Sequence, residues 1–317
     1  MTAETDASRA EDCPPPVAGD GIPHGTVVPT GTGELLAAVD ADGVLTVVLN
    51  RPQRRNAMTA DLESAYLALL RAGEADPRVR AVVVTGAGNA FCAGADLSAL
   101  HDLSAGAADD SRHTARDTDG PPPEDSTVGA TRDPGYPLTF AKPLIAAIDG
   151  PCIGLGFAQA LFCDIRFASE RATLATAYAR RGLIAEYGTA WLLPRLVGRG
   201  HALDLLLSGR TVDAAEARGM GLVQRVLPAA ELLPAALEYA RELARLSAPT
   251  SMAVIKAQVD ADARRGADAA LASSFALMLE SFARPDLVEG LAALGERRAP
   301  RFAPWPPADP ARGPARP

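Results

Sequence analysis

The sequence predicts an α/β fold, and three observations carry this prediction. Short apolar runs at residues 82–84 and 143–148 end in glycine turns, as buried strands do. A segment with apolar residues at helical spacing precedes the first of these runs. After Val226 the strand-like runs stop and only helical patterns follow. Helices that alternate with buried strands indicate a sheet covered by helices.

The N-terminal elements follow from turn and helix signals. Residues 1–33 are rich in proline, glycine, threonine and acidic residues, so we expect a disordered leader. Two apolar runs, 34–39 and 43–49, flank an Asp-Ala-Asp-Gly turn and predict a β-hairpin. Apolar residues then recur at helical spacing from Thr59, and acidic residues in the first turn complement the positive end of a helix that we expect to reach residue 75.

The middle and C-terminal parts of the chain differ in composition. We expect an α/β core over residues 34–226, with a polar insertion at about residues 104–135 that is too rich in Asp, Pro, Gly, Ser and Thr to be core. The insertion is either a lid or a disordered loop, and we favour a mobile segment beside the site. Helical patterns make residues 227–302 a helical C-terminal region. The proline-rich residues 303–317 predict a disordered tail.

Composition excludes several classes of function. The formal net charge is −8 at pH 7, which argues against a broad nucleic-acid surface, because phosphate binding needs an excess of Lys and Arg. Neither the 4 cysteines nor the 4 histidines show metal-ligand spacing, so no metal site is expected. The acidic N-terminus does not resemble a signal or transit peptide, and no apolar run reaches the roughly 18 residues of a membrane span. We therefore expect a cytoplasmic protein without membrane contact.

Two stretches after predicted strands carry small residues that let a ligand approach the backbone. In residues 86–97, glycines and alanines precede a polar turn, so an N–H there can donate to a ligand. In residues 146–164, a strand leads into Gly154-Leu155-Gly156, which opens a helix and directs free N–H groups at a nearby anion. These glycines also match part of a dinucleotide fingerprint, but the following segments do not continue a nucleotide-binding βαβ series.

Further motifs stand in a compatible order around these stretches. LNRP at 49–52 and RNAM at 55–58 precede them, and matching segments continue to Phe302. Together the motifs resemble the crotonase (enoyl-CoA hydratase/isomerase) superfamily over residues 35–302. The resemblance implies a crotonase-type spiral of ββα units with a C-terminal helical trimerisation region, so we expect a homotrimer or a dimer of trimers. It also implies an acyl-CoA substrate and no separate cofactor, since CoA is part of the substrate.

The resemblance assigns roles to particular backbone groups. In the family, two backbone amides donate hydrogen bonds to the thioester carbonyl and stabilise an enolate-like oxyanion. By position these are the N–H groups of Ala95 and Leu155; leucine replaces the usual glycine but still supplies an N–H. The CoA nucleotide is expected near Arg54 and Arg55, unless these belong to a solvated surface turn. The other positions assigned to substrate binding are Ala57, Ala93, Gly94, Asp96 and Gly154.

The sequence departs from the hydratases of this family at their two catalytic glutamates. By position these fall at Ala158 and Tyr178, so two-glutamate hydration is in doubt. Dienoyl-CoA isomerases and the 4-chlorobenzoyl-CoA dehalogenase carry an aspartate at the position of Glu186, which makes Glu186 the candidate catalytic carboxylate. A helix cap is the alternative role for Glu186. Tyr178 is a weak acid, a hydrogen-bond donor or, the role we favour, a wall of the acyl pocket.

Three functions remain open at the level of sequence. The leading hypothesis is a CoA-thioester isomerase or lyase in which Ala95 and Leu155 stabilise an enolate and Glu186 moves the proton. The alternatives are a single-carboxylate hydratase, or a hydrolase that cleaves the thioester or a C–C bond. A non-catalytic crotonase-fold binding module is the hypothesis of another class. Arg297 and Arg298 either reach a neighbouring subunit's ligand or complement a helix end.

Overall fold

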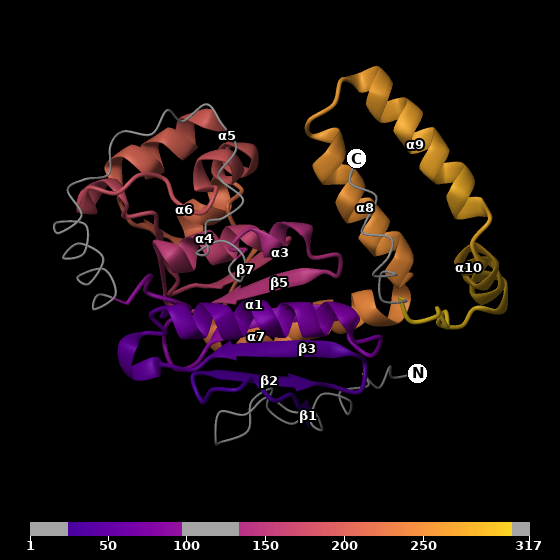
Figure 1. Ribbon diagram of the computed structural model, residues 1–317, viewed down its shortest axis with the longest axis horizontal. Helices are drawn as coiled ribbons and strands as arrows, with labels where there is room; N and C mark the ends of the chain where they lie inside the picture. Colours follow the sequence, from indigo (N-terminus) through magenta and orange to yellow (C-terminus); the bar gives the residue numbers. More distant parts are fainter. Residues whose placement is uncertain (1–24, 97–132, 306–317) are drawn as a thin grey trace, which may run out of the picture.

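The structure, a computed structural model, describes residues 25–96 and 133–305. Its centre is a seven-stranded sheet in the order β1-β2-β3-β4-β5-β7-β10. The hairpin predicted around residues 40–43 is present, and from β3 to β10 all neighbouring strands run parallel (Figure 1). The strands are β1 (Thr26–Val27), β2 (Leu35–Val39), β3 (Val44–Leu49), β4 (Ala81–Gly86), β5 (Leu144–Ile148), β7 (Ile165–Ser169) and β10 (Arg225–Leu227).

Alternate residues of the parallel strands face two separate helical layers. Val82 and Val84 of β4 pack in one core cluster with α1 (Ala60–Ala75) and α4 (Leu155–Phe162). Val83 of the same strand packs in a second cluster with α7 (Ala229–Leu246). Because successive side chains of a strand point to opposite faces, this double cover explains why the strands read as continuous apolar runs.

Helix α1 begins where the sequence predicts. The Thr59 side chain accepts a hydrogen bond from the Leu62 N–H and so caps the helix, and Asp61 and Glu63 lie in its first turn. Near its end, a Cβ on Gly73 would lie 2.9 Å from Leu45 Cδ2, so the helix packs directly on β3. The predicted end at residue 75 is confirmed.

A second, smaller sheet and its helices lie beyond the carboxyl edge of the main sheet. Strand β6 pairs in parallel with β8, and β8 pairs antiparallel with β9. The helix α5 bends at Gly198, whose φ of 76° and ψ of 159° are not helical. The elements of this layer are β6 (Pro151–Ile153), β8 (Thr173–Ala175), β9 (Val212–Asp213), α5 (Thr189–Ser208) and α6 (Ala214–Gly219), with the 3-10 turns η1 (Pro52–Arg54) and η2 (Ala179–Arg181). The short helix α3 (Tyr136–Thr139) lies instead at the amino end of β5, where it packs on α1.

Three C-terminal helices stand apart from the sheet as an arm (Figure 1). They are α8 (Pro249–Asp262), α9 (Ala267–Phe282) and α10 (Pro285–Glu296). The sequence places α7 with them in one helical region, but α7 covers the central sheet with an apolar face and belongs to the core. The arm itself exposes large apolar side chains, including Val259, Leu271, Phe275, Phe282, Val288 and Leu294.

The expected boundaries meet the described residues only in part. Residues 25–33 are expected in a disordered leader, but Thr26–Val27 forms β1 against β2 because its backbone completes the sheet edge. The expected insertion and tail lie largely outside the described residues, apart from residues 133–135 and 303–305. Within residues 25–96 and 133–305, every helix is too short or too polar to cross a bilayer.

Candidate active site

Three loops meet at the carboxyl edge of the main sheet. Register pairs Leu49 of β3 with Gly86 of β4, and both strands run parallel with β5, which ends at Ile148. The chain segments that follow these strands are residues 50–59, 87–96 and 149–155. The motif-bearing stretches of the sequence therefore come together at one edge, where open α/β sheets bind their ligands.

The backbone around Ala95 is oriented by Met58. The Met58 N–H donates to the Gly94 carbonyl at 2.7 Å, and the Asp96 N–H donates to the Met58 carbonyl at 2.9 Å. Met58 and Ala95 are thus bridge partners, and the Ala95 N–H is left pointing away from Met58. Among the described residues this N–H has no acceptor, so it is available to a ligand.

Leu155 supplies the second free amide. It is the first residue of α4, whose opening N–H groups have no partner within the helix, and its N–H has no acceptor in the described part of the chain. Gly154, just before it, adopts φ 56° and ψ −114°, a combination that favours glycine. A Cβ on Gly94 would lie 3.9 Å from the Leu155 nitrogen. A side chain at Gly94 would thus be in van der Waals contact with the Leu155 nitrogen, so the loops that carry the two free amides are neighbours.

The loop after β3 presents two arginines. Arg54 and Arg55 are exposed, and no carboxylate in the described ranges pairs with either. Asn56 below them is fully buried; it accepts from the Arg51 N–H at 2.8 Å and donates to the Ala87 and Ala90 carbonyls at 2.9 and 2.7 Å. This amide, which sequence reasoning left without a role, ties the arginine loop to the loop that carries Ala95.

Other predicted CoA contacts are already used inside the protein. The Ala57 carbonyl accepts from Arg51 Nη1 at 2.5 Å, and the Ala93 N–H donates to the Arg55 carbonyl at 2.9 Å. Asp96 Oδ2 lies 2.9 Å from Arg51 Nη1 in a half-buried ion pair. These groups hold the loop in shape, so Asp96 has a structural partner where sequence reasoning expects a ligand contact.

Tyr178 lies directly behind the Leu155 amide. Its side chain is buried, and its hydroxyl donates to the Gly154 carbonyl at 3.1 Å. Burial raises the pKa of this hydroxyl above its usual range; a hydrogen bond with the Thr189 side chain opposes the shift, and the nearby Glu186 charge adds a smaller contribution that raises it. Tyr178 and Glu186 therefore lie close enough to interact electrostatically.

Glu186 lies in the loop between Tyr178 and α5. The N-cap of α5 is Gly188, with no side-chain hydrogen bond, so Glu186 does not cap this helix. Instead its backbone carbonyl accepts from the N–H and Oγ1 of Thr189 at 3.0 and 2.7 Å. The carboxylate is half-buried and has no ion-pair or hydrogen-bond partner among the described residues. Burial raises its pKa above the ordinary value, which suits a group that both takes and returns a proton.

Comparison with known proteins decides the family. A sequence profile described as enoyl-CoA hydratase/isomerase matches residues 40–118 and 136–304. The chain belongs to the enoyl-CoA hydratase/isomerase family. This confirms the crotonase resemblance and the α/β crotonase fold, and it makes the chain a member of an enzyme family that acts on CoA thioesters. The role of the C-terminal helices in trimerisation stays a prediction.

Individual relatives span most of this chain. A provisionally named enoyl-CoA hydratase of Thermus thermophilus is 36% identical over 270 residues, which are 84% of this chain and 100% of that protein. The 1,2-epoxyphenylacetyl-CoA isomerase of Escherichia coli is 32% identical over 267 residues, 82% of this chain and 95% of the relative. The crystal structure of the enoyl-CoA hydratase EchA12_1 from Mycobacterium marinum is 43% identical, has a TM-score of 0.59 and covers 74% of this chain and 100% of its own.

In this member of the enoyl-CoA hydratase/isomerase family, α4 lacks a carboxylate on its inner face. Ala158 is buried and apolar, and the next residue, Gln159, is 3% exposed. Both amide atoms of the Gln159 side chain are buried without a hydrogen-bond partner in the described residues. No sequence pattern signals this, because glutamine within an apolar helix looks the same whether or not its amide is paired.

The remaining predicted groups lie elsewhere. Arg298 is paired with Glu289 at 2.5 Å and with Glu296 at 2.6 Å, so its charge is satisfied within its own chain. Arg297 forms the left-handed C-cap of α10, with a φ of 53°. Both lie at the end of the helical arm. No metal-binding group of three or more side chains occurs within residues 25–96 and 133–305, and the absence of a metal from the site stays a prediction.

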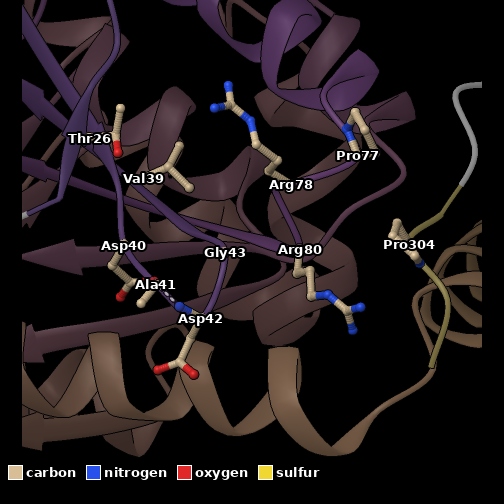
Figure 2. Close-up of a pocket in the computed structure, with 10 residues that line it drawn as sticks. All are labelled: Thr26, Val39, Asp40, Ala41, Asp42, Gly43, Pro77, Arg78, Arg80 and Pro304. Carbon is tan, nitrogen blue, oxygen red and sulfur yellow. Dashed lines mark hydrogen bonds between the residues drawn. The ribbon is translucent and has the colours of Figure 1, made fainter. Parts of the chain in front are cut away.

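A surface pocket of about 400 Å³ lies at the opposite edge of the sheet and is not part of this site (Figure 2). Its two aspartates pair with arginines of α7 at 2.8 and 3.6 Å. Arg78 pairs with Asp76 at 2.7 Å, and Arg80 donates to backbone carbonyls at 3.2 and 2.8 Å. Because each charged group has a partner, the pocket offers no uncommitted group to a ligand.

Proposed function

We propose that this chain is an acyl-CoA isomerase or lyase in which Ala95 and Leu155 hold an enolate and Glu186 moves the proton. The proposal rests on the environment of the Glu186 carboxylate. Glu186 is the site's half-buried carboxylate with a raised pKa and no committed partner in the described residues, whereas the two hydratase positions hold Ala158 and Tyr178. The name of the Escherichia coli relative, an isomerase of a CoA thioester, supports the same class of reaction.

The proposed chemistry balances without another reactant. The Glu186 carboxylate takes a proton from a carbon conjugated to the thioester, and the electron pair moves onto the thioester oxygen to give an enolate. The N–H groups of Ala95 and Leu155 donate to that oxygen, which stabilises charge as it develops. The protonated Glu186 then returns the proton to another carbon of the conjugated system, and the double bond moves while the mass stays the same. A lyase ends instead with release of a leaving group from the enolate.

Substrate attachment is proposed to depend on Arg54 and Arg55. Both are exposed cations without a carboxylate partner in the described residues, at the loop next to the Ala95 amide. Guanidinium groups suit phosphate binding because their planar donors match phosphate oxygens. In a chain with a formal net charge of −8, this local pair gives an anionic CoA nucleotide a place to bind.

Self-association is proposed through the helical arm. Leu271, Phe275 and Phe282 follow one another at helical spacing on α9, and their exposed fractions are 70%, 60% and 58%. A contiguous apolar surface of this kind usually marks a protein interface. We propose that it joins copies of this chain into a homotrimer or a dimer of trimers, as expected for the family.

A cytoplasmic location is also part of the proposal. Cys92, Cys152 and Cys163 are free, buried thiols, which fits a reducing compartment. Burial raises the pKa of the Cys92 thiol to about 11 and of the Cys163 thiol to about 12, so neither is activated for chemistry at neutral pH.

The proposal is tested with Glu186→Gln and a panel of enoyl-CoA thioesters. Glu186→Gln should abolish turnover and leave acyl-CoA affinity, measured by calorimetry, close to wild type. Glu231→Gln, an exposed glutamate in the first turn of α7, is the matched control and should keep full activity. Full activity of Glu186→Gln on the true substrate would remove Glu186 from the mechanism.

Mass spectrometry of the products separates the reactions. An isomerase product keeps the mass of its substrate, a hydratase product gains one water, and thioester hydrolysis releases free CoA. Gain of water or release of free CoA by the wild type would favour the hydratase or hydrolase alternative. A folded protein that binds no thioester of the panel would favour the non-catalytic binding module.

A further inference from the structure

The hydroxyl of Tyr178 contacts the peptide group that forms one half of the proposed oxyanion hole. It donates to the Gly154 carbonyl oxygen at 3.1 Å. That carbonyl belongs to the same planar peptide as the Leu155 N–H, and the two groups point in opposite directions. Whatever fixes the direction of the carbonyl therefore also fixes the direction of the N–H.

The peptide group between Gly154 and Leu155 is held by hydrogen bonds to its carbonyl oxygen. Gly154 adopts φ 56° and ψ −114°, so the Gly154–Leu155 peptide follows a backbone conformation that side chains disfavour. Before it, the Gly154 N–H donates to the Ala175 carbonyl at 2.9 Å; after it, the Gly154 carbonyl accepts from the Ala158 N–H at 3.0 Å. Tyr178 supplies a second donor to that carbonyl. Two donors on one carbonyl polarise the peptide, and a polarised peptide has a stronger N–H donor.

We propose that Tyr178 is a positioning residue that holds and polarises the Gly154–Leu155 peptide, so that the Leu155 N–H meets the thioester oxyanion. The inference rests on the proposed function, in which the Leu155 N–H donates to the substrate carbonyl. Tyr178 stands at the position of a hydratase glutamate. In this role its hydroxyl makes the Leu155 N–H a better donor by binding the carbonyl of the same peptide, and it takes no proton from the substrate.

Two other roles for Tyr178 fit the contacts less well. A catalytic base would have to ionise, but burial raises the pKa of the hydroxyl and its hydrogen is committed to the Gly154 carbonyl. A pocket wall needs only the ring, which does not account for the hydroxyl bond to this particular carbonyl. The Tyr178 carbonyl also accepts from the Leu183 N–H at 3.0 Å, so the same residue starts the loop that leads to Glu186.

The test compares Tyr178→Phe with wild type, since phenylalanine keeps the ring and removes the donor. We expect kcat to fall about five- to tenfold, as for the loss of one hydrogen bond, with KM nearly unchanged. The probe is cinnamoyl-CoA, an enoyl thioester whose absorption moves to longer wavelength when its carbonyl is polarised. That red shift on binding should become smaller in Tyr178→Phe, while the affinity for CoA alone stays at the wild-type value.

Leu155→Pro removes the N–H at a helix position that tolerates proline. It tests whether Tyr178 acts on the substrate through the Leu155 N–H. In this background Tyr178→Phe should cause no further loss of the red shift, because the peptide has no donor left to strengthen. If Leu155→Pro leaves the red shift intact, the proposed oxyanion hole itself fails. If Leu155→Pro removes it and Tyr178→Phe does not reduce it, only the role of Tyr178 fails.

A second replacement covers the case in which Tyr178→Phe does not fold. Site-specific 3-fluorotyrosine at position 178 keeps the size of the ring and makes the hydroxyl a stronger donor. We expect it to increase the red shift of bound cinnamoyl-CoA. An unchanged red shift would overturn the inference, and so would loss of turnover by several orders of magnitude in Tyr178→Phe with the red shift intact, because that result indicates direct proton transfer.

Discussion

Thr189 Oγ1 donates a hydrogen bond to the Glu186 carbonyl at 2.7 Å, and the Thr189 N–H reaches the same oxygen at 3.0 Å. The side chain that is free to cap α5 therefore binds the backbone of the candidate catalytic residue, while the Glu186 carboxylate is left uncommitted among the described residues. Thr189 is fully buried, so water does not compete for its hydrogen bond to the Glu186 carbonyl, and the bond holds the loop that carries Glu186 in place.

Thr189→Val should misplace Glu186. Valine keeps the shape of threonine but leaves the Glu186 carbonyl one donor short, so we expect kcat to fall about tenfold while KM for the thioester changes little. Thr189→Ser keeps the hydroxyl and should retain most of the activity. Steady-state kinetics of both variants measure this, and equal loss in the serine and valine variants would assign the effect to packing in place of the hydrogen bond.

The raised pKa of Glu186 predicts a pH dependence of activity. Burial raises its pKa above 4.5, so the folded protein holds the proton more tightly than the unfolded chain does. A base must be ionised, so kcat should rise with pH through this raised pKa, and the acid limb should lie at higher pH than for an exposed glutamate. Glu186→Asp, measured over the same pH range, should keep a single acid limb, and a flat profile in the wild type would contradict the assignment.

The same shift predicts a pH-dependent stability difference. Because the folded-state pKa is raised, ionised Glu186 destabilises the fold at neutral pH, and this penalty disappears as pH falls below the unfolded-state pKa. Glu186→Gln should therefore unfold at a higher temperature than wild type at pH 7 and at the same temperature near pH 3.5, where both states are protonated. Calorimetry at the two pH values checks the sign, and a Glu186→Gln protein less stable at pH 7 would show that the carboxylate has a stabilising partner.

Local patterns predicted helix α1 and the two glycine-rich loops, whereas the family resemblance assigned the Ala95 and Leu155 amides within those loops to the candidate site. The apolar period after Thr59 locates α1, and the glycine turns locate the loops of Ala95 and Leu155, because each signal lies within a few residues of what it specifies. The assignment of α7 to the core was not predictable in the same way. The sequence of α7 would show the same apolar periodicity whether the helix covered the sheet of its own chain or contacted a second copy.

The side-chain half of the site depends on contacts between distant segments. The Tyr178 hydroxyl meets a carbonyl 24 residues earlier, and Asn56 reaches carbonyls 31 and 34 residues later. No local period or motif encodes these pairs, so the sequence favoured a pocket wall over a weak acid or a hydrogen-bond donor for Tyr178 and gave Asn56 no role. Thr189 was missed for the same reason, since a threonine in the first turn of a helix is usually read as a cap.

The unpaired amide of Gln159 predicts a stabilising substitution. A buried donor and acceptor without partners cost about 1–3 kcal/mol, so Gln159→Leu should raise the free energy of unfolding by a similar amount. Gln224→Leu is the matched control: Gln224 Oε1 accepts from the Arg166 N–H at 2.8 Å, and its loss should lower stability. Denaturant unfolding measures both. A destabilised Gln159→Leu would show that the amide has a partner in solution.

The two arginines of the β3 loop predict a selective loss of affinity. Replacing Arg54 and Arg55 together by glutamine should raise KM for acyl-CoA about tenfold or more with kcat unchanged, since charge-assisted bonds to phosphate are lost on binding. Arg78→Gln is the control; Arg78 is exposed and lies at the opposite end of the parallel strands, where Asp76 holds it. Raised salt should weaken wild-type binding more than binding by the double variant. Equal salt dependence would contradict phosphate contact.

The exposed apolar side chains of α9, Leu271, Phe275 and Phe282, form a stripe. If this stripe joins the copies of the chain, one charged substitution within it should dissociate the trimer or hexamer. Phe275 lies at the centre of the stripe, so Phe275→Glu would bury an unpaired carboxylate in the proposed contact between copies and should shift the protein from trimer or hexamer to monomer. Ala269→Glu adds the same charge to an exposed position of α9 on the side of the helix away from Leu271 and Phe275, and should leave the assembly intact. Sedimentation velocity distinguishes the species. A wild-type monomer, or a Phe275→Glu protein of unchanged mass, would show that α9 is not the contact surface.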